Sequence, residues 1–91
     1  MGFGYSGGIK RLDDVHGLDK KDTPNSRTDL YKNGKLFQQR WYGPDGRAAR
    51  NRDHNNHGNP KEHPNVPHDH PWDWEKSPPR QEEIAPDKDW N

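Results

Sequence analysis

The chain has 91 residues, of which 23% are hydrophobic, and its formal net charge at pH 7 is zero. This length allows one small domain at most. The absence of cysteine excludes disulfide bonds and thiolate metal sites. No apolar run is long enough to span a membrane, and no apolar secretion signal opens the chain, so we expect neither a membrane span nor a secretion signal peptide.

The charge is unevenly distributed along the chain. Residues 1–52 carry 11 Lys/Arg and 6 Asp/Glu, whereas residues 53–91 carry 4 and 9. Two interpretations remain open: the two halves neutralise each other across the fold, or a basic surface contacts nucleic acid or an acidic partner while an acidic surface mimics nucleic acid. Because so little of the chain is apolar, the core must be small and rich in aromatic residues, and it needs a further source of stability.

Residues 1–28 show neither a helical nor a strand period and are rich in Gly, Ser, Asp and Lys. We therefore expect an irregular N-terminal arm. The next segment, 29–54, carries the strongest fold signal. Asn33-Gly34 is typical of a type I′ hairpin turn, and Pro44-Asp45-Gly46 is typical of a second turn. These turns predict a three-stranded antiparallel meander, with strands near 29–32, 35–42 and 47–54.

A histidine- and proline-rich segment follows the predicted meander. Its prolines exclude a long helix, so the backbone does not hold this segment in shape by itself. His68 and His70 project on the same side of an extended chain and can clamp one metal ion. Zinc accepts tetrahedral nitrogen ligands, and the sequence predicts a zinc site formed by four histidines: His57, His63, His68 and His70.

Three further residues are candidate alternative ligands or partners for the ring N–H groups: Asp53, His54 and Asp69. The competing interpretation is a solvated loop without a ligand. A comparison of zinc-binding energy with folding stability favours the metal, because a structural zinc site contributes about 10–16 kcal/mol in small zinc-dependent peptides. The net stability of a small domain is only about 5–15 kcal/mol.

The expected fold class is therefore small α+β or mainly β. A zinc-stapled core spans 29–75, with an irregular His/Pro-rich loop. Trp72 and Trp74 either anchor a partner, or they cover the metal site or the predicted meander. Residues 76–91 form a C-terminal tail, in which residues 80–85 are expected to make a short helix.

The GPDGRA turn, followed by HGNP and HPNVPHDH, carries a resemblance that spans residues 23–74. This part of the chain resembles small histidine-rich domains encoded by Gram-positive phages and prophages, and C-terminal domains of bacterial polymorphic toxins. Within the phage setting it resembles zinc-containing anti-CRISPR proteins of type II systems. That resemblance implies an inhibitor that acts in the bacterial cytoplasm by binding the CRISPR effector, an RNA-guided nuclease. The toxin resemblance implies a metal-dependent nuclease.

We expect a non-enzymatic, zinc-stapled binding protein and assign no catalytic residue, since four histidines would close the metal site. A metal-dependent nuclease is the alternative, and a phage structural component is a third. Four arginines are expected to contact the partner or, in a nuclease, phosphates, unless they only line a solvated sheet face: Arg40, Arg47, Arg50 and Arg52.

Overall fold

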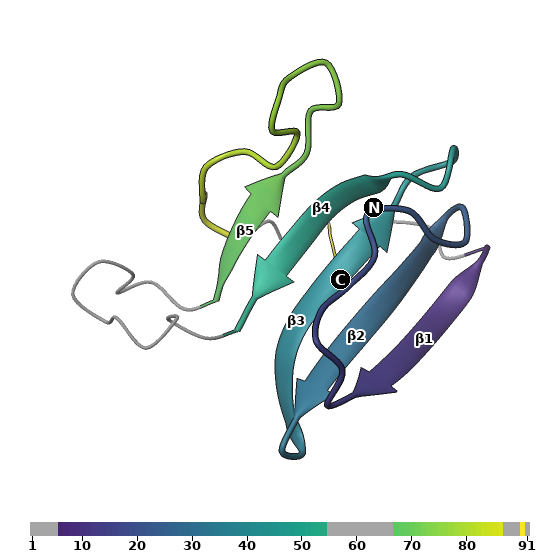
Figure 1. The fold of residues 1–91 in the computed structure, drawn as a ribbon, viewed down its shortest axis with the longest axis vertical. Helices are drawn as coiled ribbons and strands as arrows, with labels where there is room; N and C mark the ends of the chain where they lie inside the picture. The colour runs from purple at the N-terminus through teal and green to yellow at the C-terminus, as the bar shows by residue number, and fades with distance from the viewer. Residues whose placement is uncertain (1–5, 55–66, 87–89, 91) are drawn as a thin grey trace.

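A computed structural model describes residues 6–54, 67–86 and 90 of the chain. Five strands form one mixed sheet, in the order β1-β2-β3-β4-β5 (Figure 1). Strand β1 pairs with β2 in parallel, and all other neighbours are antiparallel. The strands are β1 (Gly8–Asp13), β2 (Ser26–Lys32), β3 (Lys35–Tyr42), β4 (Ala48–Asp53) and β5 (His68–Pro71). Within the described residues there is no helix, so the domain is mainly β.

The two central turns form as the sequence indicates. Asn33 and Gly34 both have positive φ angles, 53° and 76°, and they join β2 to β3. Gly46 has a φ of 80° in the turn before β4, and a Cβ atom there would lie 2.7 Å from the carbonyl oxygen of Asp22. The bounds of β3 are those predicted, because both of its ends are fixed by these turns.

The prediction of a three-stranded sheet is not confirmed, because β1 and β5 extend it to five strands. Strand β1 also lies within the segment that we expected to be an irregular arm. It carries no hydrophobic signal because it buries little: Ile9, for example, is 54% exposed. Backbone pairing with β2 forms this strand, and pairing between segments so far apart leaves no local pattern.

The predicted helix over 80–85 is also wrong. Arg80 pairs with Trp72 and Ile84 pairs with Asp69 as isolated antiparallel bridges. The backbone groups of Asp69 and Ile84 exchange two hydrogen bonds, of 2.9 and 2.7 Å. Because the segment uses its backbone groups to pair with β5, it lies extended against the sheet.

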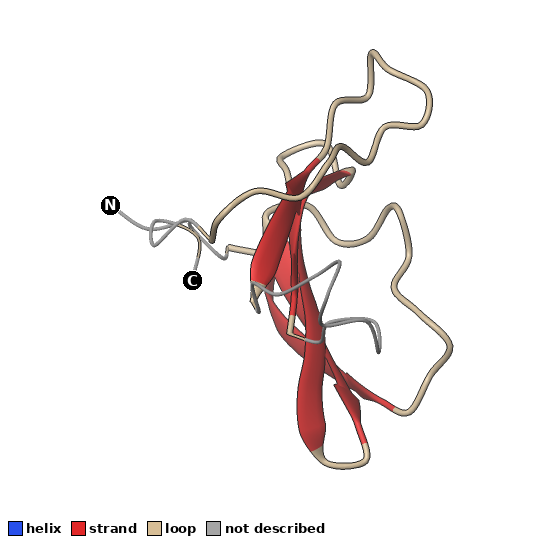
Figure 2. Cartoon of the chain, turned by 90° about the vertical axis from the view of Figure 1, so that its left-hand side faces the viewer, coloured by secondary structure: helices blue, strands red, loops and turns tan. Residues whose placement is uncertain are grey.

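The connection between β1 and β2 crosses one face of the sheet, which we call the front face (Figures 1 and 2). Arg40 donates to the backbone carbonyl oxygens of Leu18 and Asp19 in this connection. The Tyr42 hydroxyl also donates to the backbone carbonyl oxygen of Asp19. Side chains alternate along a strand, so Trp41 points to the opposite, back face. There it makes an edge-to-face contact with Trp90, at 5.9 Å between ring centroids.

The interior between these layers is mostly polar. Among the described residues, the buried hydrophobic ones are Leu30, Trp41, Tyr42 and Ala48. The buried polar and charged residues outnumber them: Ser26, Thr28, Asp29, Arg40, Arg50, Asn51, Asp53, His68 and Asp69. Hydrogen bonds and ion pairs therefore decide which arrangement of the last strands is stable, because a buried polar group without a partner is costly.

Tyr42 gives a pH test of this packing. Burial raises the pKa of Tyr42 to about 12, above the ordinary value of about 10. The unfolded chain therefore loses the phenol proton first, and stability falls as pH rises from about 10 to about 12. We expect wild-type protein to lose about 1.4 kcal/mol from this group between pH 8 and 11, measured by urea unfolding. Tyr42→Phe should lack this loss and Tyr31→Phe should keep it; equal alkaline losses in both variants would contradict the assignment.

Candidate metal centre

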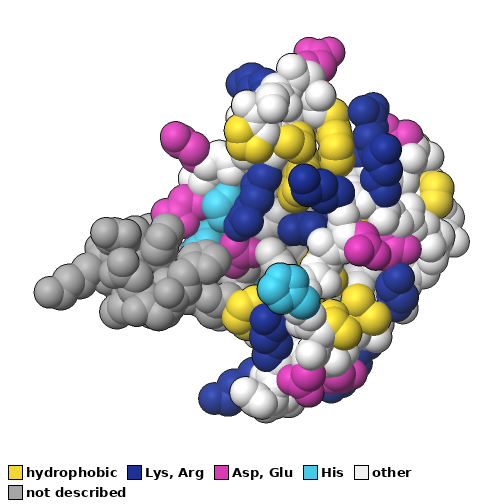
Figure 3. Space-filling model, viewed as in Figure 1, with side chains coloured by type: hydrophobic (Ala, Val, Ile, Leu, Met, Phe, Trp, Pro, Cys, Tyr) yellow, Lys and Arg dark blue, Asp and Glu magenta, His cyan; other side chains and the backbone are white. Residues whose placement is uncertain are grey.

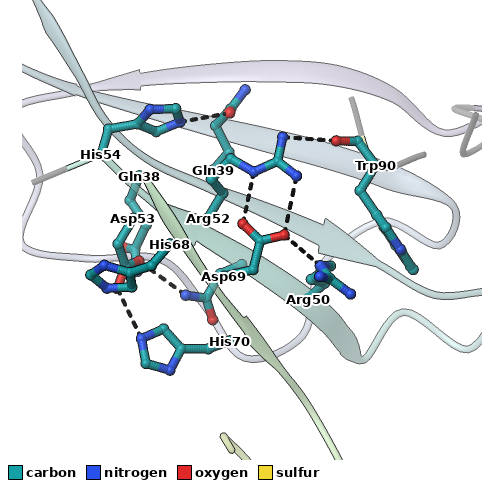
Figure 4. Close-up of polar contacts among 11 residues, drawn as sticks. Gln38, Gln39, Arg50, Arg52, Asp53, His54, His68, Asp69, His70 and Trp90 are labelled. Carbon is teal, nitrogen blue, oxygen red and sulfur yellow. Dashed lines mark hydrogen bonds and ion pairs between the residues drawn. The ribbon is translucent and has the colours of Figure 1, made fainter. Parts of the chain in front are cut away.

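Asp53, His68 and His70 converge on the front face where β4 meets β5 (Figure 4). Asp53 is the register partner of His68, and His70 follows two residues later on the same side of β5. The Nε2 atoms of both histidines lie 3.3 Å from Oδ2 of Asp53. The two rings are nearly perpendicular, at 81°, with their centroids 5.2 Å apart. Both imidazoles therefore present the same nitrogen to one carboxylate oxygen.

The Asp53 carboxylate is a buried anion, with only 1% of its side chain exposed. Its Oδ1 atom accepts hydrogen bonds from Gln38, at 2.8 Å, and Asn51, at 3.0 Å. Burial by itself would raise the pKa of Asp53, but hydrogen bonds from His70 and Gln38 and the charge of Arg80 outweigh it and hold the pKa well below its usual range. The group is therefore ionised at neutral pH and requires a cation close to Oδ2.

The segment after β5 fixes the orientation of both rings. Nδ1 of His70 lies 2.8 Å from the carbonyl oxygen of Gln81, and a carbonyl oxygen only accepts, so this nitrogen carries the proton. When the ring is protonated, Nε2–H can donate to Asp53; when the ring is neutral, Nε2 instead presents a lone pair, and only this form can bind a metal. Nδ1 of His68 lies 3.4 Å from Oε2 of Glu83. Carbonyl and carboxylate partners of this kind orient metal-binding histidines in many proteins.

The two nitrogen–oxygen separations fit a tetrahedral metal ion. Zinc binds nitrogen and oxygen at about 2.0–2.2 Å, which places two ligand atoms of a tetrahedron about 3.3–3.5 Å apart. Both Nε2–Oδ2 distances are 3.3 Å, and the three donor atoms all lie within 4.8 Å of one another. Two imidazole nitrogens and one carboxylate oxygen suit zinc and other transition metals. A cation among them would relieve the repulsion between the His70 lone pair and the carboxylate.

The other predicted ligands have different positions. His57 and His63 lie outside the described residues. The Nε2 atom of His54 lies 2.8 Å from Oε1 of Gln39, away from Asp53 (Figure 4). Burial and the nearby charge of Arg52 lower the pKa of His54, so its ring is neutral at pH 7. Asp69 points to the back face, because it alternates with His68 and His70 along β5.

On the back face, Asp69 lies between two arginines of β4. Arg50 contacts Oδ2 at 2.6 Å, and Arg52 contacts Oδ1 at 2.7 Å and Oδ2 at 3.1 Å. The side chains of Arg50, Arg52 and Asp69 are 10%, 12% and 0% exposed. Arg52 also donates to the carbonyl oxygen of Trp90, at 2.8 Å. Asp69 is therefore held in an ion-pair cluster rather than at the metal centre.

Three of the four arginines that were expected to contact a partner make contacts within the domain, and the partner itself stays a prediction. Arg40 is buried against the β1–β2 connection and under the Trp72 ring. Arg50 and Arg52 form ion pairs with Asp69, because a buried anion requires cations close to it. Arg47, whose side chain is 46% exposed, is the one of the four that reaches solvent to a large extent.

Three residues that orient the centre were missed by the sequence analysis: Arg80, Gln81 and Glu83. They lie in the tail that we expected to be helical, and no local pattern links them to the histidines. Asp53 was a secondary candidate; its position follows from the pairing of β4 with β5, which the sequence did not indicate. Figure 3 shows histidine side chains among acidic and basic side chains on the front face. The side chains of His70 and Glu83 are 14% and 38% exposed, so the candidate centre lies close to solvent.

Trp72 and Trp74 cover the front face at the end of β5. Their indole N–H groups donate to Asn51, at 2.7 Å, and to the carbonyl of Ala48, at 2.8 Å. Their rings stack at 5.6 Å. Because Asn51 also donates to Asp53, Trp72 supports the metal centre through that amide. This packing matches the interpretation that the tryptophans cover the sheet.

Comparisons of the chain with protein-family models, with curated proteins and with solved structures found no match. The described part of the chain contains no helix that is long and apolar enough to cross a membrane. The convergence of Asp53, His68 and His70 is therefore the strongest guide to function.

The Asp69 cluster can be tested by removing its negative charge alone. Asp69→Asn keeps the size and shape of the side chain but leaves the charges of Arg50 and Arg52 buried without their anion. We expect it to lower the free energy of unfolding by about 3–5 kcal/mol, measured by urea denaturation. Asp73→Asn, at a side chain that is 43% exposed, should change stability by less than about 0.5 kcal/mol. Similar losses in both variants would contradict this account of the cluster.

Proposed function

We propose that this protein is a metalloprotein that binds one zinc ion through Asp53, His68 and His70. One observation carries the proposal: the Nε2 atoms of two imidazoles each lie 3.3 Å from the same oxygen of a buried carboxylate. The other ring nitrogens contact groups that orient the rings, since Nδ1 of His70 contacts a backbone carbonyl and Nδ1 of His68 lies near a carboxylate. Asp53 already accepts hydrogen bonds from Gln38, Asn51 and Arg80, so the two imidazoles are not needed to satisfy the carboxylate. His57 and His63 remain predicted ligands for the rest of the coordination sphere.

The metal has a structural role in this proposal. Asp53 belongs to β4, and both histidines belong to β5, which is only four residues long. A metal bound to all three would fasten this short strand to the sheet, and the segment that contains Gln81 and Glu83 would be held in turn. The ion thus supplies stability that the small apolar core does not.

The biological role that we propose follows the resemblance to zinc-containing anti-CRISPR proteins. The protein binds and inhibits a bacterial RNA-guided nuclease of type II, and it is phage-encoded. Its support is that resemblance together with a candidate metal site suited to stabilising a binding scaffold. Arg47 is the member of the predicted arginine set best exposed for contact with such a partner.

A metal-dependent nuclease is the second candidate, and one observation favours it. Three protein donors leave a coordination position open, as in catalytic zinc sites. Arg80 lies beside them, 2.9 Å from Oδ2 of Asp53, where a guanidinium could contact a phosphate. The fourth ligand decides between the two candidates: a histidine from the 55–66 segment closes the site, whereas a water molecule leaves it open.

Zinc binding should depend on the three converging residues. Wild-type protein should bind about one zinc ion per chain, and chelation should lower its melting temperature. Asp53→Asn and His70→Ala should each weaken zinc binding by more than the roughly 10–100-fold typical of lost outer contacts. His16→Ala, at an exposed position in the β1–β2 connection, is the matched control and should bind normally. Metal analysis that finds no zinc, with a melting curve unaffected by chelator, would contradict the proposal.

The two functions separate in a cleavage assay. A structural zinc predicts no cleavage of DNA or RNA by the metal-loaded protein, and a stable complex with a type II effector in gel filtration. His57→Ala and His63→Ala then show whether a fourth histidine closes the site, because loss of a ligand lowers both zinc affinity and melting temperature. Wild-type cleavage that disappears in either variant, at an unchanged melting temperature, would replace the inhibitor proposal with the nuclease.

A further inference from the structure

Arg80 reaches the metal centre from the segment that follows β5. Its Nη2 atom lies 2.9 Å from Oδ2 of Asp53. The arginine side chain is 38% exposed, whereas the carboxylate is 1% exposed. The other carboxylate oxygen is engaged by the amides of Gln38 and Asn51. The guanidinium therefore occupies the same oxygen that faces both imidazole Nε2 atoms.

This oxygen would also bind the metal. A zinc ion about 2.0–2.2 Å from Oδ2 would lie within about 5 Å of a guanidinium nitrogen that is itself 2.9 Å from that oxygen. Two cations at such a distance repel each other, and the repulsion is strong where protein excludes water. Asp53 and His68 are buried and cannot move apart easily, but Arg80 is partly exposed and has a path to solvent.

We propose that Arg80 is an exchangeable counter-cation of this centre: it neutralises Asp53 in the metal-free protein and moves to the surface when the metal binds. The inference rests on the metal centre proposed above. It gives one buried carboxylate two alternative cations, so that the metal affinity of the protein is set by their competition. It also accounts for an arginine at a site that two histidines already flank.

Zinc affinities of four proteins test this competition, measured by titration against a chromophoric chelator. Arg80→Gln keeps a hydrogen-bond donor but removes the charge, and it should bind zinc on the order of tenfold more tightly than wild type, because a charge-assisted contact no longer has to be broken. Arg80→Lys keeps the charge and should bind close to wild type. Arg47→Gln removes the same charge from an exposed pair with Asp45 and should not change the affinity.

A second measurement follows the side chain itself. Modification of Arg80 by phenylglyoxal, mapped by mass spectrometry, should become faster when zinc is added, while Arg47 serves as the internal reference. Equal or weaker zinc binding by Arg80→Gln would overturn the inference and make Arg80 a support of the bound metal. Failure of all four proteins to bind zinc would overturn the metal centre itself, and the inference with it.

Discussion

Two carboxylates are buried where β4 meets β5, one on each face of the sheet, and the last third of the structure depends on how each is neutralised. Asp53 faces two imidazoles and Arg80, and Asp69 faces Arg50 and Arg52. A buried anion is tolerated only with cations or several donors around it. Strand β5, which supplies one of the carboxylates and both histidines, is therefore held by charge complementarity on both faces as much as by its backbone hydrogen bonds.

The polar interior follows from the same constraint. With so few apolar residues, the sheet cannot bury enough hydrocarbon to be stable by that means alone. It buries instead a connected set of polar groups, in which Gln38 and Asn51 hold Asp53, and Trp72 holds Asn51. Such a network is stable only when each member is satisfied, so distant segments must dock together. This explains why the tail beyond β5 lies extended against the sheet rather than forming an independent helix.

The sequence predicted the parts of this fold that depend on local chemistry. Asn33-Gly34 and the turn at Gly46 require backbone conformations that few residues adopt, and they fixed the ends of β3. The shared direction of His68 and His70 follows from strand alternation. Strand β1, the pairing of β5 and the role of Asp53 could not be predicted, because they depend on which distant segments become neighbours. The ion pairs of the β4 arginines could not be predicted for the same reason, since Asp69 is brought to them only by that pairing.

The two carboxylates differ in whether their neutralisation can change. Asp69 is paired with two nearly buried arginines, whose charge is permanent and whose side chains have little access to solvent. Asp53 is surrounded by imidazoles, which can bind metal when neutral, and by one arginine that reaches solvent. The back face thus carries a fixed ion-pair cluster, and the front face carries one whose cation can be exchanged. Because both lie on the same two strands, the fixed cluster can keep β5 in register while the cation on the other face is replaced.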